Sequence, residues 1–326
     1  MNSGPVRIGL LGAGAMGAVH ADCWSRIEGV ELAGVFSRDL GRARRLAETA
    51  GVRPVAQAAE LISDPAIDAI DVCLPSAAHA GFVVPALEAG KHVFCETPLA
   101  VSMDDAVAMR AAARRSGKLL QVGLLMRSVG SNAALKAAVD SGVHGRLVGL
   151  TAWRLGSYLR PASGDHKAHY SDPALELMTF DFDLANWLMG PPRRLFAAGQ
   201  GEVAAVLDYG EGRSATILAS GAMPAGRPFG VGLRALFEGA VFEQSASFEG
   251  AGPPKASFTL ATDQAAPQPA AAADPDPYEA ELGRFADCLR GRADPALLDV
   301  DRAIEALRLS LAARRSLAQG RPVEIS

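Results

Sequence analysis

The stretch "VRIGLLGAGAMGAVH", residues 6–20, joins an apolar run to a glycine-rich turn and the start of a helical pattern. Three of its four glycines, Gly12, Gly14 and Gly17, match the spacing G-x-G-x-x-G. Between a strand and a helix, the first glycine permits a tight turn, the second lets the backbone approach a pyrophosphate, and the third lets the helix pack on the strand. The helix N-terminus then stabilises the phosphate charge. The stretch predicts a Rossmann dinucleotide site with contacts from Gly12, Gly14, Ala15, Met16 and Gly17. The competing interpretation is that the glycines serve only the turn and its packing.

The end of the second apolar run, "VFSRD" at residues 35–39, bears on the choice of cofactor. An NAD site usually carries an acid about 20 residues after the glycine turn, where it binds the ribose 2′-hydroxyl. Here Ser37 stands at that place, and Arg38 and Arg42 follow. A hydroxyl and guanidinium groups suit a 2′-phosphate. The pattern favours NADP, with NAD as the alternative. The competing interpretation is that both arginines simply face solvent. Asp39 is expected to cap the next helix.

Strand-like and helical patterns alternate over the first third of the chain. Helices are expected at residues 15–28, 40–50, 77–90 and 102–117, with short apolar runs between them. This alternation predicts right-handed βαβ units and a parallel sheet.

After residue 123 consecutive strand-like runs replace this alternation, which indicates an antiparallel or mixed sheet. The expected elements are a helix at 131–141, a strand at 146–155, an apolar helix at 173–190, several strands between 193 and 260, a Pro/Ala-rich surface loop at 261–277, and helices at 278–290 and 299–318. The predicted fold class is α/β. An N-terminal Rossmann domain covers residues 1–123, and a C-terminal α+β domain with an open-faced, mainly antiparallel sheet covers residues 124–326.

Composition excludes several classes of function. The chain has 326 residues and a net charge of −4, and its basic residues are scattered, so nucleic acid is not an expected partner. No apolar run reaches the roughly 18 residues of a membrane span, and the N-terminus does not resemble a signal peptide. The four cysteines are widely spaced, which is typical of reduced thiols in a cytoplasmic protein. No His/Cys cluster has zinc-like spacing, so no metal site is predicted.

Three longer segments resemble the glucose–fructose oxidoreductase / inositol dehydrogenase / MocA (Gfo/Idh/MocA) family. They are "VCLPSAAHAGFVVPALEAGKHVFCETPLA" (72–100), "DPYEAELGRFADCLRG" (276–291) and "LAARRSLAQGRPVEI" (311–325). The resemblance implies hydride transfer between NAD(P) and a sugar, inositol or similar polyol. It also implies a homodimer or homotetramer that uses the open sheet. The positions it places at the cofactor are Leu74, Pro75, His79, Glu96 and Thr97.

The family's catalytic motifs are altered in this chain. The usual E-K-P motif reads Glu96-Thr97-Pro98, so a threonine replaces the lysine beside the nicotinamide. The usual D-x-x-x-H motif becomes Glu176 and Phe180, so the histidine is also replaced. Neither threonine nor phenylalanine can exchange a proton near pH 7, whereas a positioned acid or base contributes about 10²–10⁴-fold in rate. Of the three carboxylates on the apolar helix, Glu176 is the best catalytic candidate, Asp181 is expected to form structural hydrogen bonds, and Asp183 is compatible with either role. The competing interpretation is that all three are only paired or solvated.

Other groups near this helix could replace the missing pair. The loop "GDHKAHYSD", residues 164–172, precedes the helix and borders the family's substrate pocket. Within it, His169 and Tyr170 are further catalytic candidates, and His166 and Lys167 are candidates for substrate contact, as are Arg127 and Phe180. Histidine titrates in the useful range, although polar loops often carry such residues without a role.

Three functions remain compatible with this pattern. The first is an NAD(P)-dependent oxidoreductase acting on a sugar-like, cyclic polyol or keto substrate. The second is a lyase or glycoside-cleaving enzyme that retains its dinucleotide and oxidises its substrate transiently. The third is a non-catalytic dinucleotide-binding protein.

Overall fold

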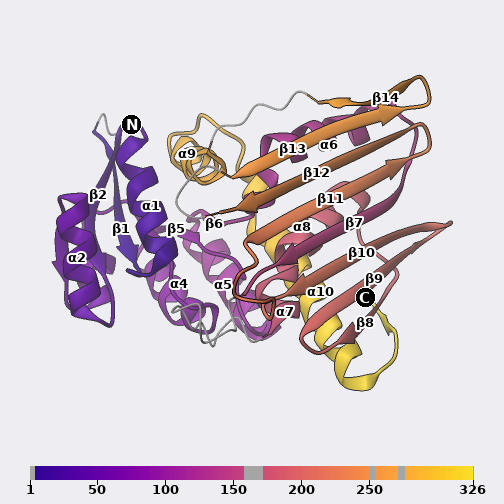
Figure 1. Cartoon of the computed structure of the whole chain (residues 1–326). Helices are drawn as coiled ribbons and strands as arrows, with labels where there is room; N and C mark the ends of the chain where they lie inside the picture. Colours follow the sequence, from indigo (N-terminus) through magenta and orange to yellow (C-terminus); the bar gives the residue numbers. More distant parts are fainter. Residues whose placement is uncertain (1–3, 158–171, 250–253, 271–275, 326) are drawn as a thin grey trace. The chain divides into compact units, whose positions relative to one another are not determined.

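The computed structural model describes residues 4–157, 172–249, 254–270 and 276–325 (Figure 1). Its contacts divide the chain into two compact units. The first unit comprises residues 1–128 and 275–304, and the second comprises residues 129–274 and 305–326. The units are therefore interleaved along the chain, whereas the predicted boundary between 1–123 and 124–326 is a single cut.

The first unit is built on a six-stranded parallel sheet with the order β3-β2-β1-β4-β5-β6. Its strands are β1 (Val6–Leu11), β2 (Val30–Phe36), β3 (Arg53–Val55), β4 (Ala69–Val72), β5 (His92–Cys95) and β6 (Leu120–Val122). The order reverses between β1 and β4. In open α/β sheets ligands bind at this reversal, beyond the carboxyl ends of the strands.

Helices connect these strands as the alternating pattern predicts. They are α1 (Ala15–Arg26), α2 (Leu40–Ala50), α3 (Ala58–Ile62), α4 (His79–Glu88) and α5 (Met103–Ser116), with 3-10 turns η1 (Ser76–Ala78), η2 (Leu125–Arg127) and η5 (Pro295–Leu298). The four predicted helices are confirmed to within a few residues. The short elements β3 and α3 were not predicted, because three to five residues carry too little periodicity.

A helix from far along the sequence completes the core of the first unit. Helix α9 (Pro277–Leu289) packs on α1. Phe285 of α9 lies edge-on to Phe94 of β5, with ring centroids 5.5 Å apart, and to Trp24 of α1 at 6.4 Å. All three rings are fully buried, so α9 belongs to the hydrophobic core of this unit.

The second unit contains a nine-stranded mixed sheet with the order β14-β13-β12-β11-β7-β10-β9-β8-β15. Its strands are β7 (Leu147–Leu155), β8 (Arg194–Gly199), β9 (Glu202–Gly210), β10 (Arg213–Ser220), β11 (Phe229–Phe237), β12 (Ala240–Phe248), β13 (Lys255–Thr262), β14 (Ala265–Pro269) and β15 (Val323–Glu324). Strands β7 and β10 pair in parallel, and the other neighbours pair antiparallel. The predicted α+β class is confirmed.

One face of this sheet carries helices, and no helix among the described residues covers the opposite face (Figure 1). The helices are α6 (Gly130–Ser141), α7 (Pro173–Glu176), α8 (Met178–Met189) and the later part of α10 (Val300–Gln319). On the uncovered face Phe196, Val206 and Thr216 lie side by side in the register of β8, β9 and β10. We call this surface the open sheet face. No helix in the described part of the chain is long and apolar enough to span a bilayer.

The prediction that residues 261–277 form only a surface loop is wrong for part of this segment. Strand β13 extends to Thr262, and β14 follows as an edge strand, pairing Thr262 with Ala265. Its two prolines, Pro267 and Pro269, lack the N–H group that a central strand needs, but an edge strand tolerates this loss.

Candidate functional site

Glycine is found at the three positions of the turn after β1 for different structural reasons. Gly12 has φ +126°, and a Cβ atom there would lie 2.3 Å from the Cys73 carbonyl oxygen. A Cβ on Gly17 would lie 2.0 Å from the Gly12 carbonyl oxygen. Gly14 differs, because a Cβ on it would meet no atom of the described chain within 4 Å. Packing thus explains Gly12 and Gly17, whereas Gly14 borders open space.

The open space at Gly14 coincides with the beginning of α1. Gly14 is the N-cap residue, and no side chain of the described residues caps the helix there. The next residue, Ala15, is exposed, and Met16 is half-buried. The first N–H groups of a helix lack intrahelical partners and attract anions, so this end of α1 can accept a phosphate.

Backbone hydrogen bonds fix the glycine turn at the reversal of the sheet. The Gly12 N–H donates to the Phe36 carbonyl oxygen at 2.8 Å, and the Cys73 N–H donates to the Leu11 carbonyl oxygen at 2.8 Å. These bonds join the carboxyl ends of β1, β2 and β4. The predicted dinucleotide turn therefore lies where a Rossmann sheet binds its cofactor.

Asp39 caps α2, as predicted from the sequence. Its Oδ1 accepts from the Arg42 N–H at 3.1 Å, and its Oδ2 lies 3.5 Å from the Arg42 Nε. The Ser37 hydroxyl oxygen accepts from the Asp39 N–H at 3.3 Å. Arg38 is exposed beside them. The Asp39 carboxylate thus forms its hydrogen bond with the N-terminus of α2, and the exposed side chains of Arg38 and Arg42 beside it are cationic.

His79 lies inside the first unit, at 1% exposure. Its Nε2 lies 2.7 Å from the Leu74 carbonyl oxygen, and its Nδ1 lies 3.1 Å from the Leu99 carbonyl oxygen and 3.3 Å from the Cys95 sulfur. Burial lowers the pKa of His79, so the ring is neutral near pH 7. The ring joins the loop of Leu74 and the exposed Pro75 to the end of β5 and to Leu99. Both ring nitrogens contact groups of the protein, so His79 holds this loop in place.

Glu96, at the end of β5, is joined to a buried histidine that the sequence reasoning missed. The Glu96 Oε1 lies 2.9 Å from the His20 Nε2, and its Oε2 accepts from the Thr97 N–H at 2.9 Å. The other His20 nitrogen, Nδ1, lies 2.9 Å from the Asp71 Oδ2. Trp24 Nε1–H also donates to this Asp71 oxygen, at 2.7 Å. Thr97 is half-buried next to this network.

His20 is protonated in this setting. Burial by itself would lower its pKa, but the neighbouring Cys73 and Asp71 side chains raise it well above its usual range. Burial raises the pKa of the Cys73 thiol, so this thiol is neutral near pH 7. Both ring nitrogens face carboxylate oxygens, and only an imidazolium can donate to both. His20 therefore supplies a buried positive charge between Asp71 and Glu96.

A fourth member of this interior cluster, Glu281, comes from α9. It is fully buried, and neither of its side-chain oxygens has a hydrogen-bond partner among the described residues. Burial, and secondarily the charge of Glu96, raises the pKa of Glu281 well above its usual range. A possible sequence signal is its place in the apolar pattern of the helix 278–290, between Tyr278 and Phe285.

Metal binding does not fit this cluster as it stands. The donor atoms of His20, Glu96 and Glu281 lie within 4.8 Å of one another. Both His20 nitrogens are already bonded to carboxylates, and a metal would have to displace one of these bonds.

The predicted catalytic helix of the second unit divides into α7 and α8 at Leu177. Asp172 caps α7 by accepting from the Leu175 N–H at 3.2 Å, and Gly190, with φ +79°, ends α8, as predicted. Glu176 is buried, at 7% exposure. The sequence therefore identified both ends of this helical segment.

Asp181 and Phe180 both contact Arg154 of β7. The guanidinium lies 3.3–3.4 Å from the two Asp181 oxygens, and its carbon lies 4.6 Å from the centre of the Phe180 ring. The predicted structural role of Asp181 is confirmed. Burial raises the pKa of Asp181, although Arg154 acts in the opposite direction. The Phe180 ring therefore packs against the guanidinium of Arg154.

Other predicted site residues are placed as follows. Arg127 is buried in the first unit, at 5% exposure. Its Nη1 donates a hydrogen bond to the Leu297 carbonyl oxygen at 3.2 Å. The loop candidates His166, Lys167, His169 and Tyr170 lie outside the described residues. The predicted site residues of the first unit and those of the second unit form two separate sets.

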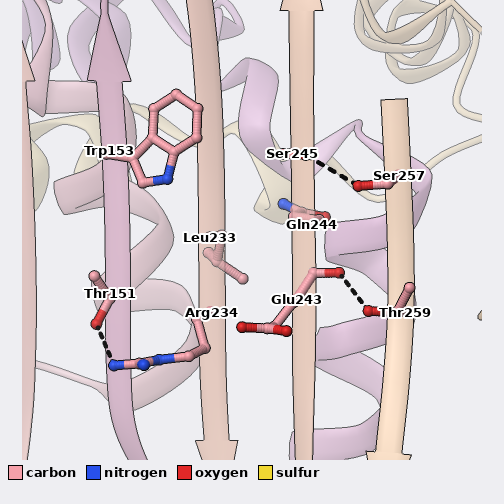
Figure 2. A pocket seen from close by; sticks show the side chains of 9 residues that line it. All are labelled: Thr151, Trp153, Leu233, Arg234, Glu243, Gln244, Ser245, Ser257 and Thr259. Carbon is pink, nitrogen blue, oxygen red and sulfur yellow. Dashed lines mark hydrogen bonds between the residues drawn. The ribbon is translucent and has the colours of Figure 1, made fainter. Parts of the chain in front are cut away.

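The open sheet face carries a hollow of about 450 Å³ (Figure 2). Its lining residues are Thr151, Trp153, Leu233, Arg234, Glu243, Gln244, Ser245, Ser257 and Thr259. The Trp153 ring lies over Gly232, where a Cβ would come within 2.3 Å of the indole. Arg234 donates to the Thr151 hydroxyl at 3.3 Å, and the hydroxyls of Ser245 and Ser257 are 3.0 Å apart. This hollow is a shallow polar surface between neighbouring strands, and the sequence did not predict it.

Comparison with known proteins agrees with the geometry of the first unit. Residues 6–124 match the Gfo/Idh/MocA family, described as an oxidoreductase family with an NAD-binding Rossmann fold. The chain is 27% identical to scyllo-inositol 2-dehydrogenase (NAD(+)) of Bacillus subtilis over 98% of this chain and 96% of that protein. It is 30% identical to myo-inositol 2-dehydrogenase of Thermotoga maritima, over 60% of this chain and 58% of that protein.

The whole fold also has known counterparts. The structure of myo-inositol 2-dehydrogenase from Lactobacillus plantarum matches with a TM-score of 0.82, covering 99% of this chain and 100% of that one at 21% identity. Residues 6–124 therefore carry the NAD-binding Rossmann fold of the Gfo/Idh/MocA oxidoreductase family, and the whole chain is similar in fold to inositol dehydrogenases.

Proposed function

We propose that this chain is a member of the Gfo/Idh/MocA family and transfers a hydride between a nicotinamide dinucleotide and an inositol-like polyol or keto sugar. The observation that carries the proposal is the uncapped start of α1 at Gly14, where open space meets the reversal of a Rossmann sheet. The names of its relatives supply the substrate class, because the similar proteins include scyllo- and myo-inositol dehydrogenases. We expect a cytoplasmic enzyme.

The proposed reaction uses the chain's residues in distinct roles. The turn at Gly12, Gly14 and Gly17 and the start of α1 bind the pyrophosphate. Bound NAD(P) supplies the hydride acceptor or donor. Thr97 lies beside Glu96 and can hydrogen-bond the substrate or the ribose. Alcohol oxidation also releases a hydroxyl proton, which needs an acceptor.

The proposed acceptor of this proton is Glu176 or one of the loop residues His169 and Tyr170. Thr97 and Phe180 stand where the family motifs have lysine and histidine, and neither can titrate near pH 7. The contact of Phe180 with Arg154 supports a packing role for this ring. Arg127, His166 and Lys167 are the proposed substrate contacts.

Turnover should be followed at the nicotinamide absorbance with scyllo-inositol, myo-inositol and related polyols. The variants Glu176→Gln, His169→Asn and Tyr170→Phe each remove a titrating group and preserve shape. At least one should reduce kcat by about 10²-fold or more with cofactor binding intact. Asp183→Asn, which removes a buried carboxylate of α8, is the comparison variant. Full turnover in all three variants would refute the assignment.

A retained-dinucleotide lyase is the second candidate, favoured by the loss of both titrating motif residues. It predicts that cofactor copurifies in one redox state and that no polyol changes the nicotinamide absorbance. A non-catalytic dinucleotide-binding protein would bind cofactor and turn over none of these substrates, including those of a lyase.

A further inference from the structure

A chain of buried charges leads from α1 to the turn after β5. The imidazolium of His20 donates to Asp71 on one side and to Glu96 on the other, both at 2.9 Å. The second Glu96 oxygen accepts from the Thr97 N–H at 2.9 Å. The position of the Glu96 carboxylate therefore fixes the backbone at Thr97, which the proposed function places beside the cofactor.

Glu281 lies next to this chain of contacts without joining it. It is fully buried, and its donor atoms lie within 4.8 Å of those of Glu96 and His20. Gly123 borders both carboxyl groups: a Cβ there would lie 3.2 Å from the Glu96 Oε2 and 3.7 Å from the Glu281 Oε1. Since no described residue gives Glu281 a hydrogen bond, an ionised form would be an uncompensated buried charge.

The charge count decides which carboxyl holds a proton. Asp71 and Glu96 both accept hydrogen bonds from His20, and they share its positive charge. A third ionised carboxylate would leave two net negative charges in the interior. Two neighbouring buried carboxylates cannot both ionise cheaply, and Glu281 is the one with no donor to stabilise its anion.

We propose that Glu281 is a neutral carboxylic acid in the folded protein and acts as a positioning residue for the Glu96–Thr97 turn. By remaining neutral it leaves Glu96 as the sole anion on the Nε2 side of His20. Ionisation of Glu281 would repel Glu96 and compete for the imidazolium, which would loosen the turn that holds Thr97. Only the effect on cofactor binding rests on the proposed function.

The other charged groups around Glu281 do not supply a compensating hydrogen bond. Asp276 caps its own helix and pairs with Arg26 of α1, which also pairs with Glu279. Arg127 of η2 donates to the Leu297 carbonyl of η5, and Asp294 caps η5. Asp71 on β4 and Glu96 on β5 add negative charge, and His20 on α1 is the cation nearest to Glu281 in the cluster.

The proposal fixes the sign of a pH effect. The pKa of Glu281 is raised in the folded state, so between its ordinary value near 4.3 and its folded value the native protein holds a proton that the unfolded chain has lost. Stability therefore falls as pH rises through this window. Glu281→Gln removes the titration, so its Tm relative to wild type should rise with pH above about pH 5, through this window.

Three measurements test the proposal, with Glu279→Gln as the matched control on an exposed turn of the same helix. Infrared spectra in heavy water near neutral pH should show a protonated carboxylic acid band that Glu281→Gln removes and Glu279→Gln retains. Thermal unfolding should show the rising Tm difference for Glu281→Gln and a flat one for Glu279→Gln. Titration with NADH and NADPH should show that the alkaline loss of affinity moves to higher pH in Glu281→Gln only.

Several results would overturn the proposal. They are an acid band that survives Glu281→Gln, a Tm difference that does not depend on pH, and a stoichiometric divalent metal in the purified protein that this substitution releases. If wild type binds neither NADH nor NADPH, the proposed function fails, whereas the infrared and unfolding measurements still decide the state of Glu281.

Discussion

Single residues in the first unit show how a polar interior can be compatible with a stable Rossmann core. His20 is fully buried and contacts Asp71, 51 residues away, and Glu96, 76 residues away. A buried charge is costly unless it is paired and hydrogen-bonded. Both its nitrogens have carboxylate partners, so its removal would strand two anions.

His20→Leu should therefore destabilise the protein by about 3–5 kcal/mol, the usual cost of removing one partner from a buried ion pair. Chemical denaturation at neutral pH measures this loss, and Asp22→Asn, on the exposed side of the same helix, should cost less than about 1 kcal/mol. The stabilisation from His20 is present below its ordinary pKa and declines as pH rises through its elevated folded pKa. An equally small effect for both variants would show that the carboxylates need no buried cation.

Arg38 should select NADPH over NADH. It is exposed at the end of β2, where the carboxylate of Asp39 is engaged by α2. Losing a charged contact to the 2′-phosphate costs on the order of 1.5–3 kcal/mol, so Arg38→Ala should weaken NADPH binding by about 10–100-fold and leave NADH binding unchanged. Fluorescence titration measures both, with Arg44→Ala on exposed α2 as the charge-matched control. Tighter NADH binding in wild type, unaffected by Arg38→Ala, would refute NADP preference.

At the scale of elements, the sequence predicted what depends on local pattern and missed what depends on distant contacts. The glycine turn, the caps at Asp39 and Asp172 and the helical segment 173–190 follow from neighbouring residues. The return of α9 to the first unit could not be read from local pattern, because it depends on contacts between Phe285, Phe94 and Trp24. The His20 cluster was missed for the same reason.

Substitutions at two glycines of the turn should distinguish an effect on folding from an effect on cofactor binding. Gly17→Ala places a Cβ 2.0 Å from a backbone oxygen, so it should lower Tm strongly. Gly14→Ala meets open space, so Tm should stay close to wild type while NADH and NADPH affinities fall, because the methyl occupies the approach of the pyrophosphate. Thermal unfolding and cofactor titration on both variants check this. Unchanged affinity in Gly14→Ala would mean that the phosphates lie elsewhere.

At the scale of the whole molecule, the open sheet face needs a cover. Antiparallel sheets can leave one face to water, but that face is then usually polar. Here Phe196, at 38% exposure, and Val206, at 44%, are paired neighbours on β8 and β9, and Leu236, at 46%, lies on β11 in another row of the same face. Exposed apolar side chains that gather on one face can mark an interface between proteins. A second copy of the chain is the partner that the family resemblance implies.

We therefore expect a homodimer or homotetramer assembled through the open sheet face. Val206→Glu puts a charge beside Phe196 on the open sheet face, and burying an unpaired charge is costly, so the variant should sediment as a monomer at concentrations where wild type is assembled. Val143→Glu is the control, because Val143 is 68% exposed in the turn after α6, away from the strands. Its sedimentation should match wild type. A wild-type protein that remains monomeric at all concentrations would rule out this assembly, and assembly that survives Val206→Glu would place the interface on another surface.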